Sequence, residues 1–242
     1  MCRDDTLWPP LPASLPSAYK CPAMNELQRL KRAMCDIGRR LWERGYVEGN
    51  AGNLSVRFAD NRVLCTPTLI SKGFMKPADL CVVDLAGNPV AGSRKRTSEI
   101  LLHLEIMKRQ PKARAVVHCH APFGTAYATA GRVPPTGIIP EAEVMLGPVA
   151  VAPYYRTATP ELGRAVCRFV GKHQVILLAN HGVVAWSETL EDAYWRVETL
   201  EAYGRVMLLI QQLGLKPRRL TARQLREVLE LKRRYGFVDP RL

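Results

Sequence analysis

The feature that most constrains the fold is a pair of apolar runs, 175–179 and 182–186, that turn at Asn180-His181-Gly182. Short apolar runs bounded by turn residues are typical of buried strands, and two strands joined by so short a turn form a hairpin. Hairpins mixed with helices favour a sheet covered by helices over a strictly alternating parallel fold. Further strands are predicted over 54–58, 62–66, 80–85, the run before His118, and 149–152.

Apolar residues recur at three- and four-residue spacing from Leu27 to Leu41, which predicts an amphipathic helix. A second helix is predicted from near Thr97 to Arg109, where Pro111 stops it. The proline-containing segment 134–148 is predicted to be irregular. Other helices are predicted over 121–130, 159–170, 188–213 and 221–235.

The composition indicates one globular unit. With 242 residues, of which 47% are hydrophobic, the chain can bury a sizeable core. Residues 1–23 are rich in proline and lack periodicity, so we expect a flexible extension followed by one folded domain over 24–242. The start of the chain does not resemble a secretory signal, and no apolar run approaches the roughly 18 residues that span a bilayer. The cysteines number seven, without a Cys-x-x-Cys pair. This pattern indicates a reducing compartment, so we expect a cytoplasmic protein.

The net charge of +13 is the one unusual property of the composition. Nucleic-acid binders usually interleave basic clusters with aromatic residues, which here amount to only 7%. We therefore expect solvated basic faces and neither a nucleic-acid nor a membrane partner. A cationic protein also raises the local concentration of anions, which would favour a phosphorylated substrate.

Three of the five histidines lie where predicted strands end. His118 and His120 close the segment Arg-Ala-Val-Val-His-Cys-His (114–120), and His181 lies in the hairpin turn. Side chains two apart on a strand share a face, so His118 and His120 can reach one ion while Cys119 points away. Three neutral imidazoles suit Zn²⁺ and neighbouring divalent transition metals, and they leave a position open for substrate. The alternative is a set of hydrogen-bonded structural histidines.

Two short segments are suited to hold an anion. The glycine-rich turn 49–55 offers backbone N–H groups and the side chains of Asn53 and Ser55. Thr68 closes the segment Thr-Pro-Thr, 66–68. Each is weak evidence when it is considered alone, because such turns are common.

The predicted start of the second helix carries more specific candidates. Thr97 and Ser98 would place hydroxyls beside free N–H groups, an arrangement that favours phosphate, although ordinary helix capping explains them equally well. Glu99 follows directly. Near a metal, its carboxylate could be a fourth ligand, a proton-abstracting base, or both in different steps.

Together these segments resemble the class II aldolase family, which includes sugar-phosphate aldolases and 4-epimerases. They occur in the family's order and cover roughly 25–237, which makes the combination far more specific than any one of them. The matching segments are Gly52-Asn-Leu-Ser-Val-Arg, Thr66-Pro-Thr, Thr97-Ser-Glu, Val116-Val-His-Cys-His-Ala, Ala152-Pro-Tyr and Asn180-His-Gly.

The resemblance implies a three-layer α/β/α sandwich around a mostly antiparallel sheet, with the whole of 24–242 as the catalytic domain. It also implies a fourfold-symmetric homotetramer with active sites between subunits. The implied metal is Zn²⁺, or sometimes Mn²⁺, on His118, His120 and His181, with Glu99 as ligand and base. In the family's aldolases, the phosphate of dihydroxyacetone phosphate would lie against positions that match Asn53, Thr68, Thr97 and Ser98.

This sequence departs from fuculose-phosphate aldolase at two places. Leu69 replaces the glycine that helps to form the phosphate pocket. In the family, a tyrosine from a neighbouring subunit protonates the departing aldehyde. Its position aligns near Ile139 of this sequence, where no tyrosine lies between 128 and 153. Glu141 or Glu143 could project into the site there or be solvated. A second family tyrosine, near the C-terminus, has a match in Tyr235. The resemblance implies a catalytic role for Tyr235, and the alternative is a packing residue at the helix end.

These residues favour a metal-dependent aldolase that cleaves a phosphorylated ketose reversibly to dihydroxyacetone phosphate and a small aldehyde. A 4-epimerase, a decarboxylase or a dehydratase could use the same metal-stabilised enolate. A non-catalytic binding module related to adducin is the alternative from another class. The presence of the three histidines and Glu99 argues against it.

Overall fold

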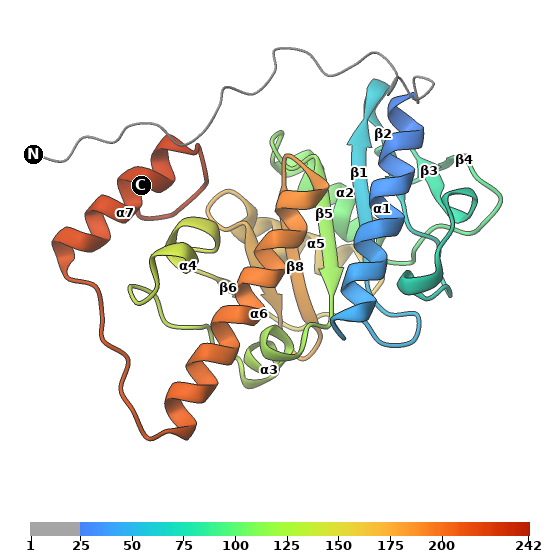
Figure 1. Ribbon diagram of the computed structural model, residues 1–242. Helices are drawn as coiled ribbons and strands as arrows, with labels where there is room; N and C mark the ends of the chain where they lie inside the picture. Colours follow the sequence, from blue (N-terminus) through green and yellow to red (C-terminus); the bar gives the residue numbers. More distant parts are fainter. Residues whose placement is uncertain (1–24) are drawn as a thin grey trace, which may run out of the picture.

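A computed structural model describes residues 25–242, so the extension expected over 1–23 lies outside the described residues. Eight strands form one sheet in the order β4-β3-β2-β1-β5-β8-β7-β6 (Figure 1). Neighbouring strands are antiparallel except β6 and β7, which confirms the predicted mostly antiparallel sheet. The strands are β1 (Asn53–Phe58), β2 (Arg62–Cys65), β3 (Cys81–Val83), β4 (Pro89–Ala91), β5 (Ala115–Cys119), β6 (Ala150–Ala152), β7 (Val175–Leu178) and β8 (Gly182–Ser187).

Helices cover both faces of the sheet, as the three-layer prediction requires (Figure 1). One hydrophobic core joins the sheet to α1, α3, α4 and α6, and a second core joins the opposite face to α2 and α5. None of the helices between 25 and 242 is long and apolar enough to cross a membrane. The helices are α1 (Glu26–Glu43), α2 (Ile100–Arg109), α3 (Pro122–Ala130), α4 (Pro140–Met145), α5 (Pro160–Val170), α6 (Leu190–Gln212) and α7 (Ala222–Arg234).

Strand β5 in the middle of the sheet shows how alternation assigns side chains to the two cores. Val117 and Cys119 belong to the core under α1 and α6, whereas Val116 belongs to the core under α2 and α5. By the same period of two, His118 shares the face of Val116. The register pairs His118 with Asn53 of β1 on one side and with Val184 of β8 on the other. The sheet therefore places His118 beside Asn53, beneath the start of α2.

One sequence prediction about local structure is wrong, and the structure defines another more closely. The segment 134–148 is not irregular throughout, because α4 occupies its middle. With only six residues, this helix is too short for apolar periodicity to reveal it, although Pro140 stands at a first-turn position that favours helix initiation. The second helix begins at Ile100 with Glu99 as its N-cap residue, which agrees with the predicted start near Thr97-Ser98-Glu99.

A buried charge network fixes the C-terminal segment to α4 and α6. Lys232 on α7 donates hydrogen bonds to the Glu143 carbonyl oxygen and to Asp239. Arg241 pairs with both Asp239 and Glu143, at 2.8 and 2.7 Å. Arg196 of α6 donates to the Met145 carbonyl. The network holds α7 and the chain end at the side of the molecule beyond α4 (Figure 1).

Candidate functional site

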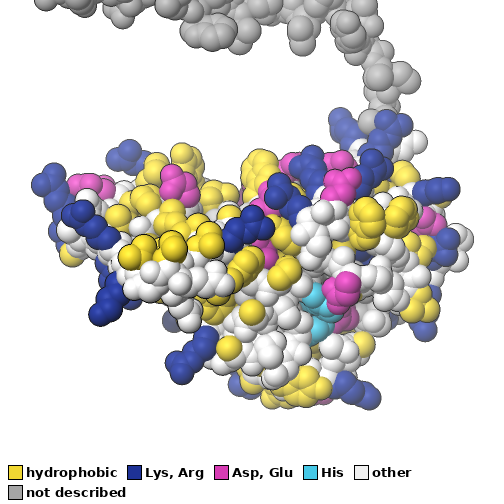
Figure 2. All heavy atoms as spheres, turned by 60° about the horizontal axis from the view of Figure 1, so that its bottom comes forward, with side chains coloured by type: hydrophobic (Ala, Val, Ile, Leu, Met, Phe, Trp, Pro, Cys, Tyr) yellow, Lys and Arg dark blue, Asp and Glu magenta, His cyan; other side chains and the backbone are white. Residues whose placement is uncertain are grey.

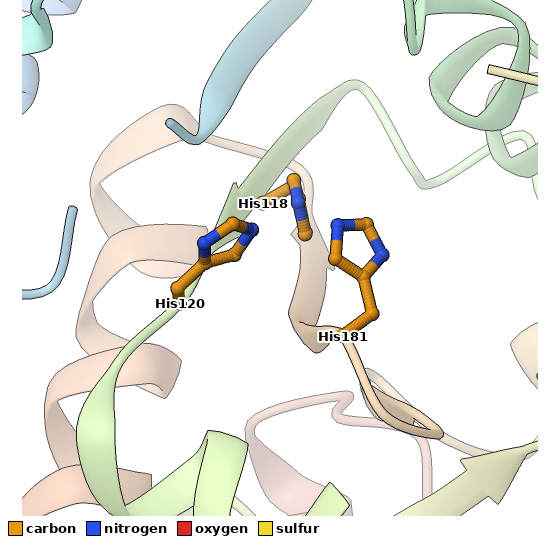
Figure 3. A group of neighbouring side chains, drawn as sticks. All are labelled: His118, His120 and His181. Carbon is orange, nitrogen blue, oxygen red and sulfur yellow. The ribbon is translucent and has the colours of Figure 1, made fainter. Parts of the chain in front are cut away.

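The three predicted histidines meet at the end of β5. His118 lies in β5, His120 is the first residue after that strand, and His181 occupies the turn between β7 and β8 (Figure 3). Their ring centroids lie 4.6 to 5.3 Å apart. One ligand atom from each ring lies within 4.8 Å of the others, so one ion between them could contact all three. The structure therefore brings together residues 63 positions apart in the chain, as the sequence predicts.

Two glycines allow the backbones that carry these histidines to approach closely. A Cβ on Gly182 would lie 2.6 Å from the Cys119 carbonyl oxygen and 2.9 Å from the His120 ring. A Cβ on Gly52 would lie 2.9 Å from the His118 carbonyl oxygen, and the φ of Gly52 is +72°. Any larger residue would push the strand ends apart. Gly182 thus allows His181 to lie close to His120. In the same way, Gly52 allows Asn53 to lie close to His118.

Hydrogen bonds orient two of the imidazoles for metal binding. Nδ1 of His118 lies 2.9 Å from the Val183 carbonyl oxygen and donates to it, while Nδ1 of His120 donates to the Glu48 carboxylate at 2.8 Å. These bonds leave Nε2 of each ring as the acceptor atom, which is the usual arrangement around a metal-binding histidine. Nε2 of His118 is buried and has no hydrogen-bond partner among the described residues.

Protonation also suits a metal. Burial lowers the pKa of His118 below its usual value and that of His181 to about 4. Both rings are therefore neutral at pH 7, the form that binds metal. The neutral rings of His118 and His181, the hydrogen bonds that orient His118 and His120, and the unpaired nitrogen of His118 all fit a divalent transition metal.

Glu99 faces the same point from the start of α2. Its Oε2 atom accepts a hydrogen bond from Asn53 Nδ2 at 2.8 Å and lies 3.4 Å from Nε2 of His118. Its Oε1 atom lies 3.7 Å from Nε2 of His181 and has no hydrogen-bond partner within residues 25–242. Burial raises the pKa of Glu99, but the nearby histidines and the Asn53 hydrogen bond outweigh burial and hold it below its ordinary value. The group is a carboxylate with one oxygen free.

A cavity of about 240 Å³ opens beside this cluster, and the predicted anion-binding residues line it. Asn53 and Thr97 are buried, Thr68 is half-buried and Ser98 is exposed. In Figure 2, histidine side chains reach the surface at this end of the sheet with acidic side chains beside them. Basic side chains are spread around the same face without forming one patch (Figure 2). The lining residues are Asn50, Ala51, Gly52, Asn53, Pro67, Thr68, Leu69, Lys72, Thr97, Ser98, Glu99, His120, Thr157 and His181.

Leu69 keeps the backbone conformation that a glycine would adopt. Its φ is +57°, in the left-handed region, and its side chain is 78% exposed at the cavity. A leucine in this region carries strain of about 1 kcal/mol. Leu69 therefore adopts a backbone conformation that favours glycine and adds an apolar side chain at the cavity's edge.

Three residues in and beneath this site were not predicted from the sequence. Lys72 lines the cavity, is 1% exposed, and donates hydrogen bonds of 2.7 Å to the carbonyl oxygens of Asn50 and Ile70. His103 is buried on α2, and its Nδ1 lies 2.7 Å from Ser55 Oγ. Glu48 orients His120. Only His103 had a usable signal, because it lies one helical turn after Glu99 and so on the same face.

Tyr235 lies at the other end of the sheet. It lines a cavity with Trp186 and Ser187, at the end of β8, whereas His181 precedes the start of β8. A strand of this length spans roughly 17 Å, so Tyr235 cannot reach the cluster of its own chain. Its side chain is 60% exposed. It could act only in the site of a neighbouring chain.

The two glutamates near Ile139 also differ from expectation. Glu143 is neither solvated nor available to a cavity: it is 2% exposed, accepts from the Gly137 N–H, and pairs with Arg241. The reason is that α7 and the chain end cover α4. Glu141 is exposed, in agreement with the solvated alternative.

Comparison with known proteins agrees with this geometry. Residues 32–208 match the family described as Class II Aldolase and Adducin N-terminal domain. A 3-oxo-tetronate 4-phosphate decarboxylase from Haemophilus influenzae is 37% identical over 82% of this chain and 95% of its own length. An L-fuculose phosphate aldolase from Methanococcus vannielii is 38% identical over 69% of this chain and 88% of its own. The crystal structure of YgbL from Klebsiella pneumoniae superimposes with a TM-score of 0.78 at 32% identity, covering 85% of this chain and 100% of that one. The chain therefore belongs to the class II aldolase and adducin family.

Proposed function

We propose that the protein is a metal-dependent lyase that breaks a carbon–carbon bond beside a carbonyl group of a phosphorylated, sugar-derived substrate. The observation that carries the proposal is one cavity whose walls hold Glu99, His120 and His181 together with the neutral donors of Asn53, Thr68, Thr97 and Ser98. The first group suits a metal and a base, and the second group suits a phosphate.

Zn²⁺ is the metal that we propose, with Mn²⁺ as the alternative. Held by His118, His120, His181 and Glu99, it would supply Lewis-acid stabilisation for the negative charge that develops on the substrate's carbonyl oxygen. Asn53 fixes one oxygen of Glu99 by its hydrogen bond. The other oxygen has no hydrogen-bond partner among the described residues. After the carbon–carbon bond has broken in decarboxylation, it could pass a proton taken up from solvent to the enediolate carbon, and in the reverse direction it could remove that proton.

Within this class, we favour decarboxylation of a 3-oxo acid phosphate. Loss of CO₂ and aldol cleavage leave the same kind of enediolate beside the carbonyl, so one site can stabilise either product. Aldol cleavage must also move a proton at the aldehyde oxygen, whereas CO₂ leaves from a carboxylate that carries no proton. The absence of a tyrosine between 128 and 153 removes the family's acid for that extra step. A relative that covers 82% of this chain is such a decarboxylase.

Aldol cleavage of a ketose phosphate is the second candidate. Its support is the similarity to L-fuculose phosphate aldolase and the exposed Tyr235, which could serve a neighbouring chain. We therefore also propose a homotetramer in which sites are completed between chains, with 24–242 as the catalytic domain. No residue among 25–242 specifically supports an epimerase or a dehydratase activity.

The test is to incubate metal-loaded protein with a 3-oxo-tetronate 4-phosphate, with L-fuculose 1-phosphate, and with the unphosphorylated form of each. Released CO₂ and aldehyde are measured separately, and the products are identified by mass spectrometry. Decarboxylation predicts CO₂ from the first compound and a strong preference for the phosphate ester. Aldehyde from the second compound without CO₂ from the first would select aldol cleavage. A protein that cleaves neither would contradict the proposal.

A further inference from the structure

Lys72 is a buried lysine in the cavity wall, and no acidic side chain of residues 25–242 pairs with it. Lys72 begins a short 3₁₀ helix, Lys72–Phe74, which packs against α1. A Cβ on Gly38 of α1 would lie 2.7 Å from the Lys72 carbonyl oxygen, and one on Gly73 would lie 2.6 Å from the Trp42 ring. These close contacts fix the lysine backbone, so the position of its ammonium group is set by the fold.

The hydrogen bonds of Lys72 tie together the two loops that carry the neutral donors. One acceptor, the Asn50 carbonyl, belongs to the glycine-rich turn that ends at Asn53. The other, the Ile70 carbonyl, belongs to the loop that contains Thr68. An ammonium group has three N–H donors, so one remains free after these two bonds. Because Lys72 lines the cavity, its third N–H group can donate to a ligand that is bound there.

No charged side chain among residues 25–242 balances the charge of Lys72. No carboxylate lies within 4 Å of it in the part of the chain that the structure describes. The other charged group of the cavity wall, Glu99, is engaged by Asn53 and the histidines. Burial lowers the pKa of Lys72 to about 8, which reflects the unfavourable free energy of an unpaired buried cation. An anionic ligand would remove that penalty.

We propose that Lys72 is the charged ligand of the substrate's phosphate group and that it completes the neutral donors of Asn53, Thr68, Thr97 and Ser98. The proposal rests on the proposed function, because it assigns this phosphate to the substrate. A phosphate is favoured here because Lys72 joins the two loops that carry the neutral donors, and these donors together suit a group with several acceptor oxygens. Lys72 therefore selects phosphorylated substrates.

The expected effect is large enough to measure in simple binding. A hydrogen bond to a charged group contributes enough that its loss weakens binding about 10- to 100-fold. The probe is inorganic phosphate added to the metal-loaded protein, with acetate as the carboxylate control, followed by calorimetry. The test variants are Lys72→Met and Lys72→Gln. The matched control is Lys76→Met, which removes an exposed lysine of the same segment that does not line the cavity.

The proposal expects the dissociation constant for phosphate to rise about 10- to 100-fold in both Lys72 variants and to stay unchanged in the control. Acetate affinity should be unaffected throughout. Unfolding temperature and metal content identify variants that have lost the fold. Unchanged phosphate affinity in a folded Lys72 variant would overturn the proposal. An equal loss of acetate affinity would also overturn it, since Lys72 would then not discriminate phosphate.

A measurement on the unaltered protein covers the case in which both variants misfold. At pH 8 about half of the Lys72 side chains are deprotonated, and acetic anhydride should acetylate them from the cavity. Phosphate should protect Lys72, and not Lys76, as measured by mass spectrometry. No labelling, or labelling without protection, would overturn the proposal. If phosphate binds through Lys72 but no substrate of the panel is cleaved, the proposed function fails and this inference stands.

Discussion

Replacing Gly182 with alanine should weaken metal binding without removing any ligand. The new Cβ would lie 2.6 Å from the Cys119 carbonyl oxygen and 2.9 Å from the His120 ring, whereas ordinary contact begins at 3.4 Å. The ends of β5 and β8 must therefore separate by about 0.8 Å, the difference between 3.4 and 2.6 Å. Metal–ligand distances tolerate only about 0.2 Å, so His181 and His120 could no longer both hold one ion well.

We expect a 10- to 100-fold loss of metal affinity, the range typical of changes that misplace a ligand without deleting it. Overpacking should also lower the free energy of unfolding by about 1 to 3 kcal/mol. The assay is competition for Zn²⁺ against a chelator of known affinity, with urea unfolding in parallel. Gly171→Ala is the control, because nothing lies within 4 Å of its new Cβ. A Gly182→Ala protein that binds metal within twofold of the wild type would refute the reasoning.

Three further changes test other parts of the site and fold. Glu99→Gln should retain phosphate binding but lose about 10²- to 10⁴-fold in turnover, since a positioned base contributes that much; near-normal turnover would remove Glu99 from the mechanism. Leu69→Gly should leave the loop intact, whereas Leu69→Val should lower stability by about 1 kcal/mol or more, because a β-branched residue tolerates a φ of +57° poorly; equal stabilities in urea would contradict this. Burial raises the pKa of Asp239, but its pairs with Arg241 and Lys232 outweigh burial and lower it from 3.8 to about 2. Its stabilisation, about 2 kcal/mol, is therefore complete above pH 4 and lost as pH falls from 4 to 2. Asp239→Asn should flatten that part of the stability–pH curve, and an unchanged curve would show that the network contributes nothing.

The sequence predicts those parts of the fold and site that depend on local patterns. The hairpin of β7 and β8 follows from two apolar runs and a turn, and alternation along β5 places His118 and His120 on one side. Because histidines stand at both strand ends, the histidine cluster could be predicted before the sheet order was known. The order of the motifs then identified the family, which the comparisons confirm.

The parts that depend on contacts between distant segments could not be predicted. Lys72 looks like any loop lysine until α1 and two loops close around it. Glu143 looks solvated because the sequence does not show that α7 and Arg241 cover it. Tyr235 matches a family motif, but its distance from the cluster depends on how α7 packs on α4. In each case tertiary packing determines the role of the side chain, and the spacing of residues in the sequence does not reveal that packing.

The most direct test of the central claim is a metal titration of activity. Metal-depleted protein is titrated with Zn²⁺ while carbon–carbon bond cleavage of the best substrate of the panel is followed. The account predicts that turnover rises from near zero to a plateau at one metal per chain, and that a variant with alanine at His118, His120 and His181 gains nothing. Full turnover in the metal-depleted protein, or in that triple variant, would contradict it.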